Sequence, residues 1–421
     1  MSMKNLLHDK IVPKYAELEK WYEARVIPKY TPFYASFDIR DSGYKIAPVD
    51  ANLYPAGFNN ICQTDKENSY DLAKEYIASH YGSSIKNIGL FVEEHTTNFF
   101  YWDNVYWIKT LLTEAGFNVF VLLPNIYDDK KSFKSASGFV VECYPVKIDP
   151  EGRVYSKIQS EVKIDLIISN NDFSSAFDSW AKDVSTPINP PLDMGWHSRT
   201  KDSFFQVYNE LVEEFCEITS LSCAILKIKT ETFNNFDLKD ETQMKLLTQK
   251  CETFFKELKD NYELNNIPYN PYMFIKNNAG TYGLGIIEVK NPLDVQAWNY
   301  KTRKTMKAAK GGKGVQSVIL QEGIPTIVKN QDDFVAEPAI YMIGSRLAGG
   351  FLRVNERKGP EDNLNAPGAV FSRLCVSDLE FDHQGKMMEN VYGWVAKLAM
   401  LAISREFQRK GIELRDPNIK I

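Results

Sequence analysis

Residues 274–286 have the sequence FIKNNAGTYGLGI, which places Lys276 at the end of a predicted strand and the glycines Gly280, Gly283 and Gly285 before the next strand. Glycines let backbone N–H groups approach phosphate oxygens, and a lysine adds a mobile cation. The G-K-[ST] of a Walker A loop is absent, and a strand rather than a helix follows, which excludes a Rossmann fingerprint. Strand, glycine flap and strand are the arrangement of ATP-grasp enzymes, although an ordinary hairpin with glycine turns explains this stretch alone equally well.

Two later segments fit a nucleotide site. A short apolar strand ends in the polar pair and glycine of residues 318–323, where an adenine ring would find backbone partners, although a plain strand explains this segment as well. A further predicted strand carries an arginine, whose planar and permanent cation suits phosphate, and a polar loop follows it. The residues expected at ATP are Lys276, Gly280, Gly283 and Gly285 over the phosphates, Gln321, Glu322 and Gly323 at adenine, and Arg353 and Asn363 at the transferring or leaving oxygens.

The acids that an ATP-grasp site needs for its metal ion are found near the N-terminus. Such a site takes an acid from one strand and an acid-x-Asn pair from its neighbour, and the C-terminal helix offers neither. Asp38 lies on one predicted strand, while Asp50 and Asn52 lie on the next, at a spacing that fits a hairpin. Carboxylate and amide oxygens are ligands that Mg²⁺ accepts. We therefore infer a circularly permuted ATP-grasp core, in preference to a hairpin whose acids only solvate turns.

Strands and helices alternate between these two regions. Predicted strands at 88–92, 118–123 and 165–169 are separated by helical patterns, which indicates βαβ units and a parallel sheet. The predicted fold class is α/β and α+β, ATP-grasp-like, with a parallel-sheet domain on the substrate side. The predicted division is 1–65 for the N-terminal helix and metal hairpin, 66–200 for the parallel-sheet domain, and 201–421 for the ATP-grasp part with the C-terminal helix.

Composition narrows the classes of partner. The chain has 421 residues, and 50 Lys+Arg against 55 Asp+Glu give a formal net charge of −5, so nothing favours a nucleic acid or an anionic membrane as partner. No apolar run of about 20 residues is present to span a bilayer. The six cysteines include no C-x-x-C pair and are expected to be reduced thiols. We expect a cytoplasmic protein, and the sequence leaves a homo-oligomer open.

Four strings together resemble one family. They are DIRDSGYKIAPVDANLYPAGFNN (38–60), NPPLDMGWHSRTK (189–201), FIKNNAGTYGLGI and DNLNAPG (362–368). They are similar to the proteobacterial glutamate-cysteine ligase (γ-glutamylcysteine synthetase) family, which belongs with ATP-grasp proteins. The resemblance implies ATP-dependent joining of the side-chain carboxylate of L-glutamate to the amine of L-cysteine, the first step of glutathione synthesis, with ATP and Mg²⁺ bound.

Candidates for the amino-acid site follow from charge and position. A predicted strand ends just before two acids, which suit an ammonium group, and two cations follow the second string and suit a carboxylate, unless they are surface charges at a helix start. The candidates are Glu93, Glu94, Arg199, Lys201, Asn59 and Asn60. Two alternatives stay open, a glutathione-synthetase-like ligase and a nucleotide-binding module without turnover. The complete set of metal acids and the lysine argues against the module.

Overall fold

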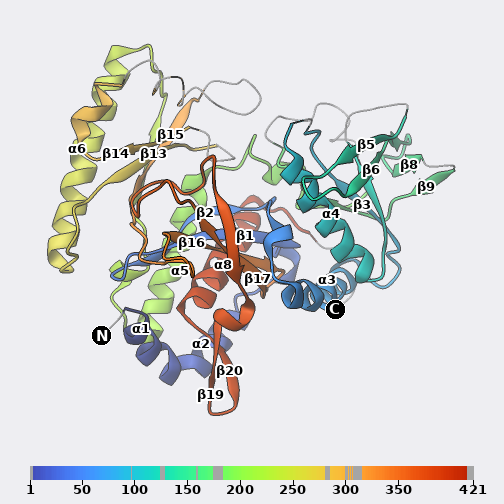
Figure 1. Cartoon of the computed structure of the whole chain (residues 1–421), viewed down its shortest axis with the longest axis horizontal. Coiled ribbons are helices and arrows are strands. Elements are labelled where there is room, and N and C mark those ends of the chain that lie inside the picture. The colour runs from blue at the N-terminus through green and yellow to red at the C-terminus, as the bar shows by residue number, and fades with distance from the viewer. Residues whose placement is uncertain are drawn as a thin grey trace.

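The computed structural model describes residues 3–95, 97–123, 129–157, 160–173, 184–279, 285–298, 302, 304, 306 and 315–414. In these ranges the chain forms three large sheets with helices packed on them, and two small sheets (Figure 1). The fold is therefore mixed α/β. Gly280 and Gly283 lie outside the described residues. None of the described helices is both long and apolar enough to cross a membrane.

A five-stranded antiparallel sheet joins the two ends of the chain. An N-terminal hairpin of two strands pairs through its first strand with three strands that lie some three hundred positions later, in the order β18-β17-β16-β1-β2. In this hairpin Asp38 lies opposite Asp50, so the predicted pairing of the two acids is confirmed. The strands are β1 (Tyr34–Asp41), β2 (Ile46–Asn52), β16 (Ala336–Ile343), β17 (Arg346–Val354) and β18 (Val370–Leu374).

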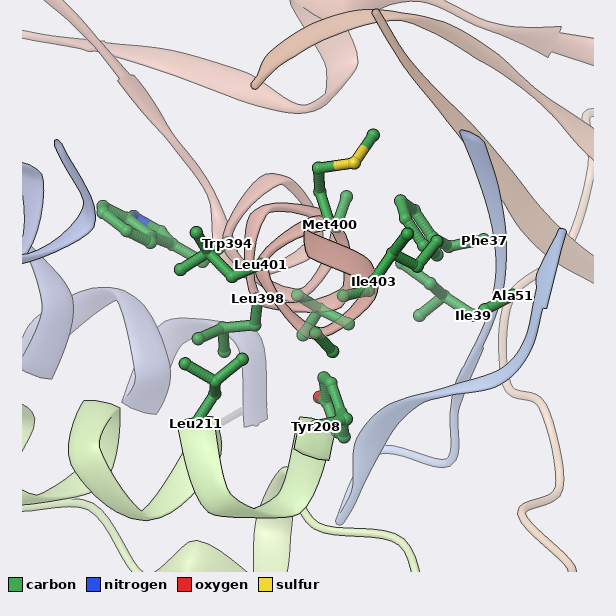
Figure 2. Close-up of a cluster of buried hydrophobic side chains, with 14 of the residues drawn as sticks. Phe37, Ile39, Ala51, Tyr208, Leu211, Trp394, Leu398, Met400, Leu401 and Ile403 are labelled. Carbon is green, nitrogen blue, oxygen red and sulfur yellow. The ribbon is translucent and has the colours of Figure 1, made fainter. Parts of the chain in front are cut away.

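Helix α8 (Val391–Lys410), near the C-terminus, packs against this sheet. The helix starts where the Asn390 side chain accepts from the N–H of Tyr392 and Gly393, and ends at Gly411, whose φ of +67° needs glycine. Its apolar side chains meet β1, β2 and α5 (Lys201–Thr219), as Figure 2 shows. The N-terminal helices α1 (Met3–Ile11) and α2 (Tyr15–Glu23) join the same core. Sixteen residues of α8 are buried, so most of the helix that packs against this sheet is itself covered by other parts of the protein.

A six-stranded sheet forms the predicted substrate side. Its order is β11-β10-β3-β4-β6-β5, and every neighbouring pair is parallel except the edge pair β5–β6. The predicted parallel sheet is confirmed. Helices α3 (Gln63–Tyr81) and α4 (Phe99–Glu114) pack on it. The strands are β3 (Asn87–Phe91), β4 (Asn118–Leu122), β5 (Lys131–Lys134), β6 (Val140–Tyr144), β10 (Leu166–Ser169) and β11 (Ile188–Asn189), and β7 (Val146–Ile148), β8 (Val154–Lys157) and β9 (Glu161–Lys163) form a small sheet.

A four-stranded antiparallel sheet carries Lys276 and most of the segment 318–323 that is expected to contact adenine. Its order is β12-β15-β13-β14, and the long helix α6 (Glu241–Leu264) packs on it, at the left of Figure 1. The strands are β12 (Thr230–Asn234), β13 (Met273–Asn277), β14 (Ile286–Val289) and β15 (Ser317–Glu322), and a small hairpin, β19 (Glu380–His383) and β20 (Lys386–Glu389), precedes α8. The three domain boundaries proposed from the sequence stay a prediction.

Candidate active site

A pocket with an empty volume of about 510 Å³ lies where the five-stranded and four-stranded sheets meet. The five-stranded sheet contributes β1, β2 and β16, and the four-stranded sheet contributes β13, β14 and β15. The two sheets thus bring the early hairpin and the late lysine strand to one cavity. It is lined by Asp38, Arg40, Val49, Asp50, Phe274, Lys276, Ile286, Gln321, Glu322, Ile324, Glu337, Asn363 and Asn365.

Four buried charged residues form a chain of ion pairs at this pocket, and three of them, Asp38, Arg40 and Glu337, line it. Arg353 donates to both oxygens of Asp38, at 2.8 and 3.1 Å, and to Glu337 at 2.6 Å. Arg40 donates from Nε to the other oxygen of Glu337 at 2.5 Å. Burial raises the pKa of Asp38 although Arg353 opposes it, whereas at Glu337 the two arginines outweigh burial and lower the pKa. Two acids and two arginines leave the network neutral.

Asp50 has a lysine on either side. Burial alone would raise its pKa, but the charges of Lys201 and then Lys276 outweigh burial and lower it. Lys201 forms an ion pair with Asp50. Lys276 donates to the Val49 carbonyl at 3.1 Å, and burial lowers its pKa to about 8, with Asp50 acting against burial. The pocket therefore offers a lysine that is charged at neutral pH and loses its proton more readily than an ordinary lysine.

The acids fit a hard divalent cation in part. Asp38 and Asp50 lie opposite each other on adjacent strands and both line the pocket, so their oxygens suit Mg²⁺. Asp38 already pairs with Arg353, and Asp50 pairs with Lys201. A bound metal ion would therefore share these carboxylates with the two cations or displace them. Asn52 lies two residues beyond Asp50 on β2 but does not line the pocket.

At the end of β15, the side chains of Gln321 and Glu322 differ in their hydrogen bonding. Gln321 is fully buried, and within the described part of the chain neither of its side-chain amide atoms has a hydrogen-bond partner. Both oxygens of Glu322, in contrast, accept from Lys45, at 2.6 and 2.7 Å. A Cβ at Gly323 would lie 2.3 Å from the ring of Tyr272, so glycine is required there. Gln321 is therefore the hinge side chain that a ligand could engage.

The residue before the flap holds the start of α5. The Asn278 carbonyl accepts from the N–H of Lys201 at 2.8 Å, and its side-chain oxygen accepts from the N–H of Asp202 at 3.1 Å. Thr200, the N-cap residue, makes no side-chain cap bond. At the other end of the flap, the carbonyl of Gly285, whose φ is +66°, accepts from Asn277 at 3.1 Å. A residue 76 positions away thus replaces the local cap.

We expect the Asn278→Ala variant to lose the side-chain part of this cap, and with it some of the fixed position of Lys201 at the start of α5. The free energy of unfolding should fall by about 1 kcal/mol, and kcat/KM for ATP should fall roughly fivefold or more. Urea denaturation and initial-rate kinetics measure the two effects. Asn278→Asp keeps the acceptor oxygen and should restore both quantities; equal losses in the two variants would contradict the capping role.

The amino-acid candidates do not line this pocket. Glu93 and Asp172 lie at the carboxyl ends of β3 and β10, are both buried, and meet where the Asp172 N–H donates to Glu93 at 3.4 Å. Glu93 also pairs with His95 at 3.0 Å, and Glu94 pairs with Lys131 at 2.7 Å. Asn59 and Asn60 lie on the short helix Phe58–Asn60, where the Asn59 amide donates to the Asn60 side chain at 3.0 Å.

The segment 194–201 connects the acids of the parallel sheet with the pocket. Trp196 donates its N–H to the Asp172 carbonyl at 3.1 Å, and Lys201 reaches Asp50 at the other end. Between them Arg199 is buried, donating to Glu406 at 2.8 Å and to the Ala51 carbonyl at 3.0 Å. Arg199 therefore fixes β2 on α8, while Lys201 pairs with Asp50, which lines the pocket.

Sequence reasoning missed three charged residues of the site. Arg40 follows Asp38 by two positions on β1, so strand alternation could have placed it on the same face. Glu337 is the single acid in the buried strand AEPAIYMI, an unusual position that signals a paired charge. Lys45, in the hairpin turn, carried no comparable signal. Of the predicted residues, Asn363 lines the pocket beside Asn365.

The fold and the pocket define a class: a mixed α/β enzyme whose active-site candidate gathers acids and cations between two antiparallel sheets. Comparison with known families makes this specific, because the family model GshA, glutamate-cysteine ligase, matches residues 8–407. A crystal structure described as a candidate gamma-glutamylcysteine synthetase from Methylobacillus flagellatus KT is 30% identical, covers 96% of both chains and has a TM-score of 0.85. The chain belongs to the glutamate-cysteine ligase family.

Two more distant structures also match. D-alanyl-alanine synthetase A from Vibrio cholerae has 10% identity and a TM-score of 0.33, over 69% of this chain and 74% of that one. A glutathione synthetase-like effector from Globodera pallida has 12% identity and a TM-score of 0.39, over 88% and 84%. These scores are too low to assign a fold. Among curated protein sequences none matches significantly.

Proposed function

We propose that this glutamate-cysteine ligase binds ATP in the pocket between β1, β2 and β13 and there joins the side-chain carboxylate of L-glutamate to the amine of L-cysteine. The observation that carries the proposal is that Asp38, Asp50 and Lys276 line one cavity although the hairpin and the lysine strand are far apart in sequence. Family membership supports the reaction and the substrates. The permuted ATP-grasp core is part of the same proposal, supported by the shared sheet of β1, β2 and β16.

The reaction requires charge neutralisation more than covalent chemistry. A carboxylate is a poor electrophile, so its oxygen attacks the γ-phosphorus of ATP to give an acyl phosphate and ADP, and the amine then displaces phosphate. Phosphoryl transfer is catalysed mainly by positioning and electrostatics. Lys276 supplies a cation to the phosphates, and Asp38 and Asp50 would hold Mg²⁺, which would supply further positive charge to neutralise the phosphates.

Glutamate would lie along the segment that joins the parallel sheet to the pocket. Its ammonium group suits the carboxylates of Glu93 and Asp172, which are buried next to each other at the strand ends. Its side-chain carboxylate would then point to Lys201 and the phosphates. In this arrangement Arg353 acts by holding Asp38, and Arg199 acts by holding β2.

One assay separates this function from its alternatives. ADP release is measured with Mg-ATP and glutamate, with and without cysteine, and then with other amines. We expect rapid ADP release only when both amino acids are present. Turnover with a preformed dipeptide and glycine would instead indicate a glutathione-synthetase-like enzyme, and no ADP in any mixture would indicate a binding module.

The unpartnered amide of Gln321 gives a prediction for the base site. In Gln321→Leu the buried orphan polar group is gone, so the variant should unfold at a higher temperature, because an unsatisfied buried amide costs about 1–3 kcal/mol. The KM for ATP should rise about fivefold or more if the amide hydrogen-bonds adenine. Thermal unfolding and ATP kinetics test both; a variant with unchanged KM for ATP would show that the amide does not contact the base.

A further inference from the structure

Two cysteines and an aspartate that the ligase reaction does not use meet on another side of the molecule. Cys62 is the residue before α3, Asp65 lies in the first turn of that helix, and Cys375 follows β18. One ligand atom from each lies within 4.8 Å of the other two. Asp65 and Cys375 are buried, and Cys62 is partly exposed. The fold therefore brings together three side chains of the kinds that bind transition metals, from segments over three hundred positions apart.

The surroundings hold these side chains in place. Asp65 accepts from the N–H of Val376 at 2.8 Å, which leaves its other oxygen lone pairs available. Arg373 donates from Nε to the sulfur of Cys375 at 2.9 Å, which fixes the position of this sulfur. Cys62 is the N-cap residue of α3, and its sulfur lies within 4.8 Å of these two groups. Two of the three potential ligands, Asp65 and Cys375, thus have an orienting partner, as ligands of metal sites usually do.

We propose that Cys62, Asp65 and Cys375 form a binding site for a thiophilic divalent cation, with Zn²⁺ as the best match. Zinc accepts thiolate and carboxylate ligands in tetrahedral geometry, whereas Mg²⁺ and Ca²⁺ prefer oxygen alone. Tetrahedral bonds of about 2.3 Å place ligand atoms about 3.8 Å apart. The three ligand atoms lie within 4.8 Å of one another, so small side-chain rotations would bring them to that spacing.

Asp65 of this proposed site also lines a cavity, whereas neither cysteine does. Asp65 and Val376 line a cavity with an empty volume of about 1350 Å³. Seven acids and two basic residues line this cavity, so its field attracts cations. Water in the cavity can complete the coordination. The other acids are Glu19, Glu23, Asp71, Glu75, Glu380 and Glu389.

A disulfide between the same cysteines is the competing product, and the structure favours the cation. A disulfide would join the two sulfur atoms alone, whereas a cation can be held by all three side chains that the fold brings together. A bound cation would stabilise both thiolates and the nearby carboxylate together, and the two thiol protons would be released to solvent. Asp65 would bind the cation as a third ligand, whereas a disulfide would not involve Asp65.

The experiment uses the full chain, purified with a reductant, and Zn²⁺ alone as the probe. After incubation with Zn²⁺ and removal of unbound metal by gel filtration, elemental analysis should find one zinc ion per chain. Cys62→Ser, Cys375→Ser and Asp65→Asn should each bind zinc at least about tenfold more weakly. Cys223→Ser is the matched control, because Cys223 also neighbours another thiol, Cys216, but among the residues that the structure describes no carboxylate completes a metal-ligand group with this pair.

Thermal unfolding gives a second measurement that does not depend on activity. Zn²⁺ should raise the unfolding temperature of the wild type and of Cys223→Ser, but not of Cys62→Ser, since a bound ion ties α3 to the segment after β18. Absence of zinc from the wild type, or equal zinc in wild type and Cys62→Ser, would overturn the proposal. Thiol titration that finds Cys62 and Cys375 oxidised to each other in the wild type, with zinc bound only elsewhere, would also overturn it.

Discussion

Replacing Lys276 by methionine is expected to lower kcat/KM for ATP by about 10²–10³-fold, the usual cost of removing one preorganised charge from a transition state. The side chain is buried at the pocket, where Asp50 favours its charged form, and it offers a positive charge to the phosphates only while it is protonated. The methionine keeps the length and the packing of the lysine stem. Initial rates of ADP release at varied ATP measure the loss.

The same lysine predicts how the rate depends on pH. Its pKa in the folded protein is lowered to about 8, so the charged fraction, and with it kcat/KM for ATP, should fall as pH rises through about 8. Lys276→Arg, whose guanidinium stays charged, should show no decline in that range, whatever its absolute rate.

An exposed lysine provides the control for this prediction. Lys259→Met, at a position on α6 where the side chain is 69% exposed, should leave the rate unchanged. If Lys276→Met kept more than about a tenth of the wild-type kcat/KM, the lysine would not act on the phosphates. A decline above pH 8 that persisted in Lys276→Arg would assign the titration to another group.

Replacing Arg353 by methionine is expected to destabilise the protein by about 3–5 kcal/mol, because buried Asp38 loses its arginine and buried Glu337 keeps only Arg40. Urea denaturation followed by circular dichroism measures the change. Adding Asp38→Asn restores neutrality, so the double variant should be more stable than the sum of the two single losses predicts.

Arg346, on the same strand as Arg353, provides the control. Its ion pair with Glu75 is exposed, so Arg346→Met should change stability by less than about 1 kcal/mol. Equal losses at the two arginines, or strictly additive losses in the double variant, would show that the four charges do not act as a network.

The elements of the fold could be predicted because their signals are local. The 3.6-residue spacing of apolar residues marks α5, α6 and α8, and the alternation of strands and helices marks the parallel sheet of β3, β4 and β10. The acids of the early hairpin and the lysine before the flap were likewise visible as residue types next to predicted strands. The sequence resemblance and the family match agree on the ligase family.

What the sequence by itself determined, therefore, is the list of elements, the family and the charged residues at the ends of its strands. Only the tertiary structure decided which of those charges meet: that β1 lies beside β16, that Arg353 holds Asp38, that Asn278 caps α5, and that Cys62 faces Cys375. The physical reason is that periodicity and propensity act over a few residues, whereas an ion pair or a cap depends on two segments that only the packed core brings within about 3 Å of each other.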